Sequence, residues 1–315
     1  METTPLWTPS EERLRNHPMT RFRAEASKRA NRPLADYDAL HAWSIEDRAA
    51  FWDLVWDFCG VSGEKGERRL VDGDRMPGAR FFPDATLNFA DNLLRRHGAD
   101  DAIVFWGEDR VRRRLSWNDL HGLVSRLQQV LLKTGVEPGD RVAAMLPNLP
   151  ETIALMLAAA SIGAVFSSCS PDFGPQGVLD RFGQIRPKVF VTCDGYYYGG
   201  KQIDIAPKLA EIVPALTSVR LVLIVPYLGK ADTVAAGLAN AVSLDAALAP
   251  FAARPVETTP MPFSHPLYIM FSSGTTGVPK CIVHSAGGTL LQHLKEIHLH
   301  CGIGEGDRLF YFTTC

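Results

Sequence analysis

The sequence predicts an α/β protein, with a helical N-terminal extension followed by part of a large domain whose mostly parallel sheets are flanked by helices. Three observations lead to this fold class. The first eighty or so residues are rich in aromatic and charged side chains and contain a clear helical pattern. From Asp101 onward, short apolar runs alternate with helical patterns. Apolar strands that alternate with helices are typical of a parallel sheet covered on both faces.

Composition excludes several classes of protein. The chain has 315 residues, of which 46% are hydrophobic and 22% charged, so it can bury a sizeable core and is not a disordered chain. A formal net charge of −2 argues against nucleic acid or a membrane surface as the main partner. The six cysteines contain no C-x-x-C pair, which argues against a zinc ribbon and favours reduced thiols in the cytoplasm. The N-terminus lacks an apolar signal segment, and the longest apolar run, 153–166, is too short to span a membrane.

We assign residues 1–83 to the N-terminal extension. Within it, "SIEDRAAFWDLVWDFCG" predicts a helix that Ser44 caps, with Asp47 three residues on as in a capping box, and that Gly60 ends. The apolar side chains of this helix fall on one stripe, which we interpret as core packing rather than a ligand site. The stripe consists of Phe51, Trp52, Val55, Trp56 and Cys59.

Residues 84–315 form the second predicted domain. Six strand patterns are expected at 102–105, 141–146, 188–192, 221–225, 267–271 and 281–284. Between the first two strands lies a helix that begins at Ser116, with Asp119 behind the cap, and stops at Gly135; Leu120, Leu123, Leu127, Val130 and Leu131 form its apolar face. Pro150 opens the next helix, which runs to about Ser161. The basic run 110–114, "RVRRR", is expected on a solvated strand edge, and the Pro- and Thr-rich segment 253–266 predicts a linker before a second sheet unit.

The stretch 271–284, "FSSGTTGVPKCIVH", places a Gly- and hydroxyl-rich loop between two strand patterns that we expect in the core. Gly274 and Gly277 allow several N–H groups to turn inward, and Lys280 adds a full positive charge. Such a loop suits a polyphosphate. It is not a Walker A loop, because Lys280 lies between Pro279 and Cys281. "GIGEG" (302–306) is not a dinucleotide fingerprint either, and we assign it to a turn. The alternative interpretation of 271–284 is a structural hairpin that happens to be rich in Ser, Thr and Gly.

The pattern [ST]-[ST]-G-[ST]-[ST]-G-x-P-K resembles the phosphate-binding signature of the adenylate-forming superfamily, which includes acyl-CoA synthetases, luciferases and the adenylation domains of peptide synthetases. Segments 115–151 and 159–174 are similar to further core motifs of that superfamily, and 33–60 resembles the segment found ahead of acetyl-CoA-type synthetases. Four stretches resemble the branch that ligates acetoacetate to CoA; they are "FSSCSPDFG", "YYYGGKQID", "PKCIVHSAGGTLLQHLKEIHLHC" and "RLFYFTTC". Cys281 departs from the glycine common in the superfamily after Pro-Lys, a departure familiar in this branch.

The resemblance implies an ATP-dependent acid–CoA ligase that forms acetoacetyl-CoA through an acyl-adenylate, releases AMP and pyrophosphate, and uses Mg²⁺ as an activator. It implies small-molecule substrates, with neither nucleic acid nor a membrane span involved. The residues expected at the ATP phosphates are Ser272, Ser273, Gly274, Thr275, Thr276, Gly277 and Lys280. Those expected at the CoA phosphates are Tyr198, Gly199, Gly200 and Lys201, although a surface hairpin with aromatic packing is an equal alternative there. His284, His293, His298, His300 and Cys301 match no zinc pattern, so we expect no protein-held metal.

In this superfamily the catalytic lysine lies on a later C-terminal domain, and Cys315 stands roughly halfway through such an enzyme. We therefore expect the AMP-binding domain to be truncated at its C-terminal end, the 315-residue fragment to be inactive alone, and Cys315 to have no catalytic role. Three alternatives to the acetoacetate ligase stay open at this point. They are an acetyl-, propionyl- or other short-chain acyl-CoA synthetase, an adenylating domain of a peptide synthetase, and a non-catalytic nucleotide-binding remnant.

Overall fold

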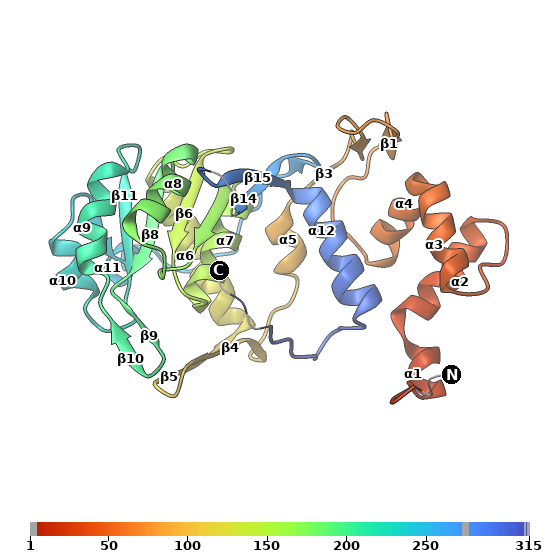
Figure 1. The fold of residues 1–315 in the computed structure, drawn as a ribbon, viewed down its shortest axis with the longest axis horizontal. Coiled ribbons are helices and arrows are strands. Elements are labelled where there is room, and N and C mark those ends of the chain that lie inside the picture. The colour runs from red at the N-terminus through yellow and green to blue at the C-terminus, as the bar shows by residue number, and fades with distance from the viewer. Residues whose placement is uncertain (1–4, 273–276, 312, 314–315) are drawn as a thin grey trace. The chain divides into compact units, whose positions relative to one another are not determined.

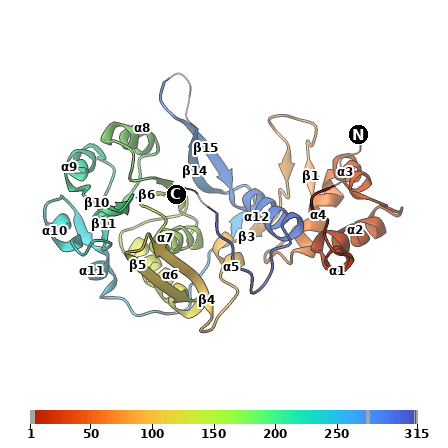
Figure 2. The ribbon, with the colours of Figure 1, turned by 60° about the horizontal axis from the view of Figure 1, so that its bottom comes forward.

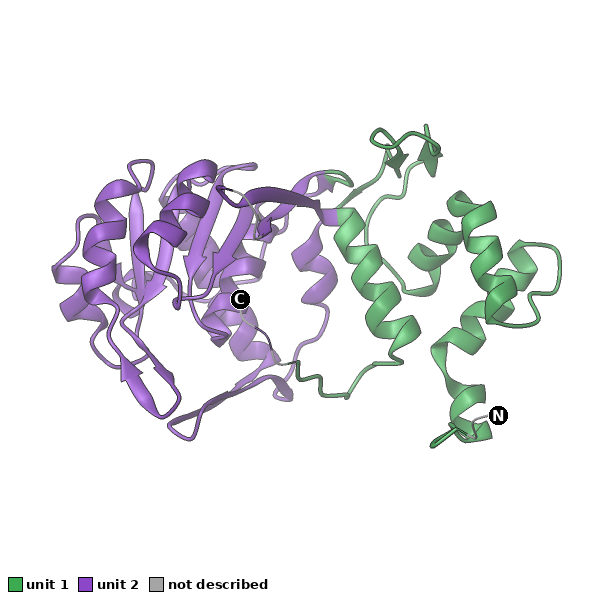
Figure 3. Ribbon diagram, in the orientation of Figure 1, with its two compact units in different colours: residues 1–87, 262–264, 287–311 green, residues 88–261, 265–286, 312–315 purple. Residues whose placement is uncertain are grey.

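The computed structural model describes residues 5–272, 277–311 and 313. The chain divides into two compact units (Figure 3). The first combines residues 1–87 with 262–264 and 287–311, and the second combines 88–261 with 265–286 and 312–315. The predicted domain boundary between residues 83 and 84 stays a prediction.

The first unit is built mainly from helices (Figure 1). Its elements are α1 (Glu11–Asn16), α2 (Pro18–Arg29), α3 (Tyr37–Glu46), α4 (Arg48–Phe58), the short strands β1 (Leu70–Val71), β2 (Arg80–Phe81) and β3 (Thr86–Leu87), nearly all of α12 (Ala286–Leu294), and the π-helical turn η1 (Lys295–His300). Aromatic rings fill its core. Phe22 contacts the rings of Phe51 and Phe58 edge-on, with centroid distances of 5.8 and 5.4 Å. Val55 and Trp56 are buried, as the interpretation of the α4 stripe as core packing requires.

The predicted start of this helix is wrong. Ser44 lies inside α3, where its hydroxyl donates a hydrogen bond to the carbonyl oxygen of His41 at 2.7 Å. Asp47 is the actual N-cap of α4, because its carboxylate accepts a hydrogen bond from the N–H of Ala50 at 3.0 Å. An earlier cap at Asp36 starts α3, so Ser44 is already in a helix when the chain reaches the break at Asp47. The end of α4 is as expected, since Gly60 follows in a left-handed conformation with φ of 63°.

A seven-stranded sheet forms the centre of the second unit. Its strand order is β12-β11-β8-β6-β7-β14-β15. The strands are β6 (Arg141–Met145), β7 (Val165–Cys169), β8 (Val189–Cys193), β11 (Leu221–Val225), β12 (Ala241–Ser243), β14 (Pro266–Ser272) and β15 (Lys280–Ser285); β13 (Met261–Pro262) precedes β14 outside this sheet. Every neighbouring pair is parallel except β14 and β15. The mostly parallel sheet predicted from the sequence is thus confirmed.

Helices cover both faces of this sheet, with α8 and α9 on one face and α6 and α7 on the other (Figure 2). The helices of this unit are α5 (Phe89–Leu93), α6 (Trp117–Lys133), α7 (Pro150–Ser161), α8 (Pro175–Ile185), α9 (Ala206–Ala215), α10 (Ala231–Ala236) and α11 (Leu244–Leu248). The capping box of Ser116 and Asp119 at the start of α6 is present, and the predicted apolar face is buried. No helix in the described part of the chain combines the length and apolar character needed to cross a membrane.

Two predictions about the later strands are wrong. Segment 253–266 does not lead to a second sheet unit, because β14 joins the same sheet beside β7, with Tyr268 opposite Phe166. The pattern at 281–284 is not a core strand either. β15 is the last strand in the sheet order, and Ile282 and Val283 are 44% and 57% exposed. An apolar run alone cannot tell a strand paired on both sides from one at a sheet edge.

Two short hairpins stand outside the central sheet. One pairs β4 (Asp101–Gly107) with β5 (Val111–Ser116), and the other pairs β9 (Tyr196–Tyr198) with β10 (Lys201–Ile203). The basic run 110–114 lies on the first hairpin, where Arg112 and Arg114 are exposed as expected for a solvated edge. The tips of the two hairpins lie side by side (Figure 1).

Candidate functional site

The candidate phosphate loop connects β14 to β15. Ser272, the last residue of β14, is the register partner of Lys280, the first residue of β15, so these two predicted site residues lie opposite each other at the mouth of the loop. Ser273, Gly274, Thr275 and Thr276 lie outside the described residues. Because β14 runs parallel to β7, Ser272 lies at the carboxyl edge of the parallel sheet. Ligands of open α/β sheets bind at this edge.

Gly277 shows why the loop needs glycine on its return side. Its φ is +106°, a conformation that residues with a Cβ rarely adopt, and no atom of the described residues lies within 4 Å of a Cβ built there. Backbone conformation therefore favours glycine at this position. Lys280 is exposed at the start of β15, so its ammonium group is accessible to a ligand.

Helix α8 supports the base of this loop, which sequence reasoning missed. The side-chain amide of Gln184 donates a hydrogen bond to the carbonyl oxygen of Pro279 at 2.9 Å, and its amide oxygen accepts one from the thiol of Cys281 at 3.7 Å. The guanidinium of Arg181 lies 4.0 Å from the ring centroid of Phe173 and 5.8 Å from that of Phe271. The contacts with Phe271, Pro279 and Cys281 join residues about ninety or more positions apart, so no local pattern could have indicated them. The cysteine at position 281 thus has a structural partner.

The second candidate site is the turn between β9 and β10. Gly199 and Gly200 have φ of 58° and 74°, as a two-residue hairpin turn requires, and Tyr198 is the register partner of Lys201. Tyr198 is 67% exposed, and Lys201 is exposed as well. The segment is therefore a surface hairpin, and Tyr197 packs edge-on against Tyr227 at 5.4 Å. An exposed turn that carries a lysine is compatible with either alternative stated from the sequence.

Hydrogen bonds fix the base of this hairpin at the carboxyl edge of the sheet. The hydroxyl of Tyr196 donates to Asp172, which also accepts a hydrogen bond from the Ser170 hydroxyl at 2.8 Å. Burial and, after it, the Asp172 carboxylate raise the pKa of Tyr196. Asp194 accepts hydrogen bonds from three backbone N–H groups of the loop after β11, at 2.6–2.8 Å. These contacts tie together the loops that follow β7, β8 and β11.

The two candidate sites emerge from the same edge of one sheet. The β9–β10 hairpin follows β8, and the phosphate loop follows β14. In the sheet order β8, β6, β7 and β14 are consecutive neighbours. Three inter-strand spacings separate β8 from β14, so the carboxyl ends of these two strands lie about 14 Å apart. This edge can therefore present cationic and N–H donor groups to two separate anionic groups of one or two extended ligands.

Two cysteines, Cys169 and Cys193, end strands of the sheet at this edge and are buried. Burial raises the pKa of the Cys169 and Cys193 thiols to about 12, so both stay protonated at neutral pH. The ring of His284 packs against Tyr268, with a centroid distance of 5.1 Å. Within residues 5–272, 277–311 and 313, no group of three or more His, Cys, Asp and Glu side chains could hold a metal ion.

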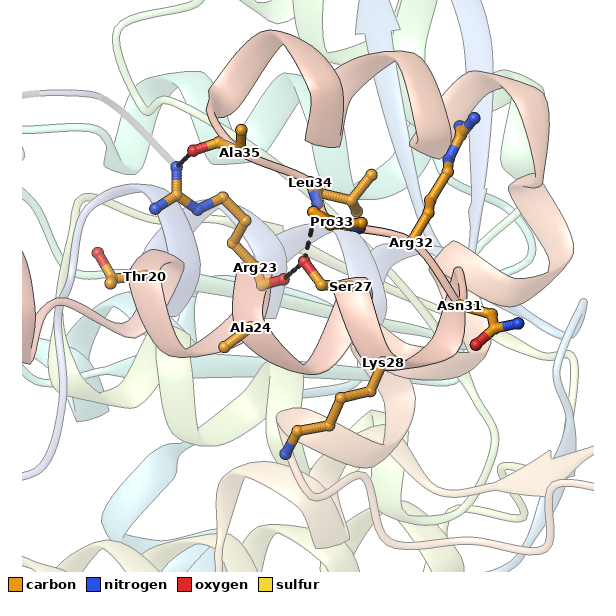
Figure 4. A pocket seen from close by; sticks show the side chains of 10 residues that line it. All are labelled: Thr20, Arg23, Ala24, Ser27, Lys28, Asn31, Arg32, Pro33, Leu34 and Ala35. Atoms are coloured by element: carbon orange, nitrogen blue, oxygen red, sulfur yellow. Dashed lines mark hydrogen bonds between the residues drawn. The ribbon is translucent and has the colours of Figure 1, made fainter.

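Three cations line a hollow of about 680 Å³ in the first unit (Figure 4). Arg23 donates to the carbonyl oxygen of Ala35 at 2.6 Å, Lys28 pairs with Glu25 at 2.7 Å, and Arg32 pairs with Glu46 at 2.5 Å. Each cation thus already has an internal partner. The hollow contains none of the predicted site residues.

Comparison with known proteins relates the chain to adenylate-forming enzymes. The family described as AMP-binding enzyme matches residues 90–315, and the acetyl-coenzyme A synthetase N-terminus matches 37–93. An acetoacetyl-coenzyme A synthetase of Rhizobium meliloti (strain 1021) is 58% identical over 311 residues, which cover 99% of this chain and 48% of the relative. One from Macaca fascicularis is 39% identical over 326 residues, covering 100% of this chain and 48% of the relative. The solved structure of acetoacetyl-CoA synthetase from Streptomyces lividans superposes with a TM-score of 0.91 at 40% identity, covering 99% of this chain and 48% of that one. The chain thus spans about half the length of the relatives it matches.

Proposed function

Because the chain belongs to the AMP-binding enzyme family, we propose that the whole protein is an acid–CoA ligase that makes acetoacetyl-CoA from acetoacetate, ATP and CoA. The observation that carries the proposal is 58% identity, over 99% of the chain, to a relative named acetoacetyl-coenzyme A synthetase. The exposed lysines at the carboxyl edge of the sheet are the chemical support, since the two phosphate-bearing substrates, ATP and CoA, are anionic.

In the first half-reaction, a carboxylate oxygen of acetoacetate attacks the α-phosphorus of ATP, and the bond to the β-phosphate oxygen breaks. Acetoacetyl-AMP and pyrophosphate result. The work of the protein in such a step is alignment and charge stabilisation. We assign this role at the β- and γ-phosphates to the loop 272–277 and Lys280. Lys280 supplies positive charge, and the hydroxyls and N–H groups of the loop supply hydrogen-bond donors.

In the second half-reaction, the thiol sulfur of CoA attacks the acyl carbon, the thiol proton is lost, and AMP leaves. CoA carries its phosphates far from the thiol, so binding them contributes affinity and orientation. We assign this contact to Tyr198, Gly199, Gly200 and Lys201, where Lys201 meets a phosphate and the two glycines let the backbone come close. The exposure of this turn supports the assignment.

Mg²⁺ would bind at this site together with ATP, through the ATP phosphates. Proteins usually bind Mg²⁺ through substrate phosphates, water and one or two carboxylates, and the described residues hold no cluster that could bind an ion alone. When bound, the ion neutralises charge on the phosphates. We assign the phosphates that carry it to the hydroxyl of Ser272 and the ammonium group of Lys280, and the register pairing of these two residues supports the assignment.

AMP release by the whole protein, as its gene encodes it, tests the function. The panel comprises acetoacetate, 3-hydroxybutyrate, butyrate, propionate and acetate, each with ATP and CoA. We expect acetoacetate to have a clearly higher kcat/KM than butyrate. A pocket that donates a hydrogen bond to the ketone leaves a buried donor unpaired when butyrate binds, which is costly. Equal kcat/KM values for acetoacetate and butyrate would establish a general short-chain acyl-CoA synthetase instead.

We also propose a cytoplasmic location, small molecules rather than nucleic acid as partners, and a domain boundary near residues 83 and 84. Free cysteines at 59, 169, 193, 281 and 301 and the net charge of −2 support the first two proposals. The match of an N-terminal family to 37–93 and of the AMP-binding family from residue 90 supports the third. Cell fractionation, a nucleic-acid binding assay and limited proteolysis test these three points.

A further inference from the structure

The proposed CoA turn lies on a hairpin that needs support from outside. β9 and β10 contain three residues each and form a separate two-stranded sheet. A two-stranded hairpin alone is at best marginally stable in water. The Tyr196 hydrogen bond anchors the base of this hairpin, but its tip lies several residues away. Other contacts must therefore fix the position from which Lys201 meets a phosphate.

The tip of the β4–β5 hairpin supplies these contacts. The N–H of Gly200 donates a hydrogen bond to the Glu108 carboxylate at 3.0 Å. The carbonyl oxygen of Gly200 accepts one from the Arg110 guanidinium at 3.4 Å. Both polar groups of a single glycine are thus bound by two oppositely charged side chains from one turn. We call Glu108 and Arg110 the clamp.

Aromatic contacts next to the clamp also join the same two hairpins. The ring of Tyr227 lies edge-on to Tyr197 of β9 at 5.4 Å and to Phe105 of β4 at 6.1 Å. The Arg110 guanidinium also lies 5.9 Å from the centroid of the Tyr197 ring. A Cβ at Gly107 would stand 2.1 Å from the Tyr227 hydroxyl oxygen, so a larger residue there would displace the Tyr227 ring or the strand. Specific side-chain contacts therefore hold the two hairpins of the second unit against each other.

We propose that the clamp positions the β9–β10 turn for CoA, so that Glu108 and Arg110 are positioning residues for the second half-reaction. The inference rests on the proposed function of the turn. Pairing the two charges has an electrostatic reason. A carboxylate beside a phosphate site repels the ligand, and the neighbouring guanidinium offsets that repulsion. The clamp can thus fix Gly200 from both sides without adding net negative charge beside Lys201.

The test measures the KM for CoA of the whole protein, with pyrophosphate exchange as the readout of the first half-reaction. We expect Glu108→Ala to raise the KM for CoA about two- to threefold and Arg110→Ala about fivefold, since exposed charge contacts are individually weak. The effect of Arg110→Ala is larger because it leaves the carboxylate uncompensated. Pyrophosphate exchange should stay within about twofold of the wild type in both variants. Glu108→Gln should restore most of the wild-type KM, because an amide oxygen still accepts the Gly200 hydrogen bond.

Matched controls lie on the same hairpin. Asp109→Ala removes the neighbouring carboxylate of the turn, and Arg112→Ala removes a guanidinium that lies 4.9 Å from the Trp106 ring centroid. Neither variant should change the KM for CoA. In a Lys201→Ala background, Glu108→Ala should have little further effect, because a positioning residue acts through the group that it positions. Fully additive effects of these two substitutions would contradict the proposal.

Hydrogen exchange of the amides in 196–203 provides a second measurement that needs no CoA. It therefore tests the clamp contacts independently of the proposed function. Glu108→Ala should speed exchange at the Gly200 amide, whereas Asp109→Ala should not. Unchanged exchange at Gly200 would overturn the clamp. A lower KM for CoA in Glu108→Ala would also overturn it, because the carboxylate would then compete with the phosphate for the same N–H.

Discussion

The two hairpins assigned to phosphate groups are attached to the molecule in different ways. β14 belongs to the seven-stranded sheet, where it pairs with β7, and the hydroxyl of Ser167 donates a hydrogen bond to the carbonyl oxygen of Ile269 at 2.7 Å. The β9–β10 hairpin lies outside that sheet, and side-chain contacts position it. Main-chain anchoring suits a loop that aligns reacting phosphates, where small displacements are costly. Side-chain anchoring is sufficient for a turn that binds a remote part of the substrate.

The largest effect is expected at the first hairpin. In the whole protein, Lys280→Ala should reduce pyrophosphate exchange on the order of 10²-fold, because it removes a preorganised charge from the phosphates. The melting temperature should change little, since Lys280 is exposed. Lys133→Ala, on the exposed side of α6, is the matched control and should leave exchange unchanged. Normal exchange in the Lys280 variant would mean that the β14–β15 loop does not bind the ATP phosphates.

An intermediate effect, confined to the other half-reaction, is expected at the second hairpin. Lys201→Ala should raise the KM for CoA about 5- to 30-fold, the loss of one charge-assisted hydrogen bond, and leave pyrophosphate exchange nearly intact. The exposed Lys230, in the loop after β11 at the same edge of the sheet, provides the control substitution. The comparison between the hairpins fails if Lys201→Ala lowers pyrophosphate exchange as strongly as Lys280→Ala does.

The smallest effect concerns the base of the second hairpin. Tyr196→Phe removes the hydrogen bond to Asp172 and should reduce the free energy of unfolding by about 1 kcal/mol at neutral pH. Because the pKa of Tyr196 is raised, the folded state binds the phenolic proton more tightly than the unfolded state does. The stabilisation is therefore complete below about pH 10 and decreases as the pH rises beyond that value. Thermal unfolding of both proteins between pH 7 and 11 measures this, and a difference that grows above pH 10 would contradict the assignment.

Local chemistry made some elements predictable from the sequence. The capping box of Ser116 and Asp119, the apolar face of α6 and the start of α7 at Pro150 all depend on residues within a turn or two of each other. The same kind of reasoning chose the wrong cap for α4, because Ser44 and Asp47 are both good capping residues. The choice between them followed from α3, whose own cap at Asp36 places Ser44 inside a helix.

The sequence by itself determined the alternation of strands and helices, the position of the Gly- and Ser-rich segment between two strands, and the two-glycine turn that carries Lys201, because periodicity and backbone preference are local properties. Only the tertiary structure decided that β14 joins the first sheet, that β15 lies at the end of the strand order, and that Gln184 supports the loop at Pro279. It also decided that Glu108 and Arg110 meet Gly200. These contacts join residues about ninety or more positions apart, and pairing at that separation depends on how the whole sheet closes, which no window of sequence contains.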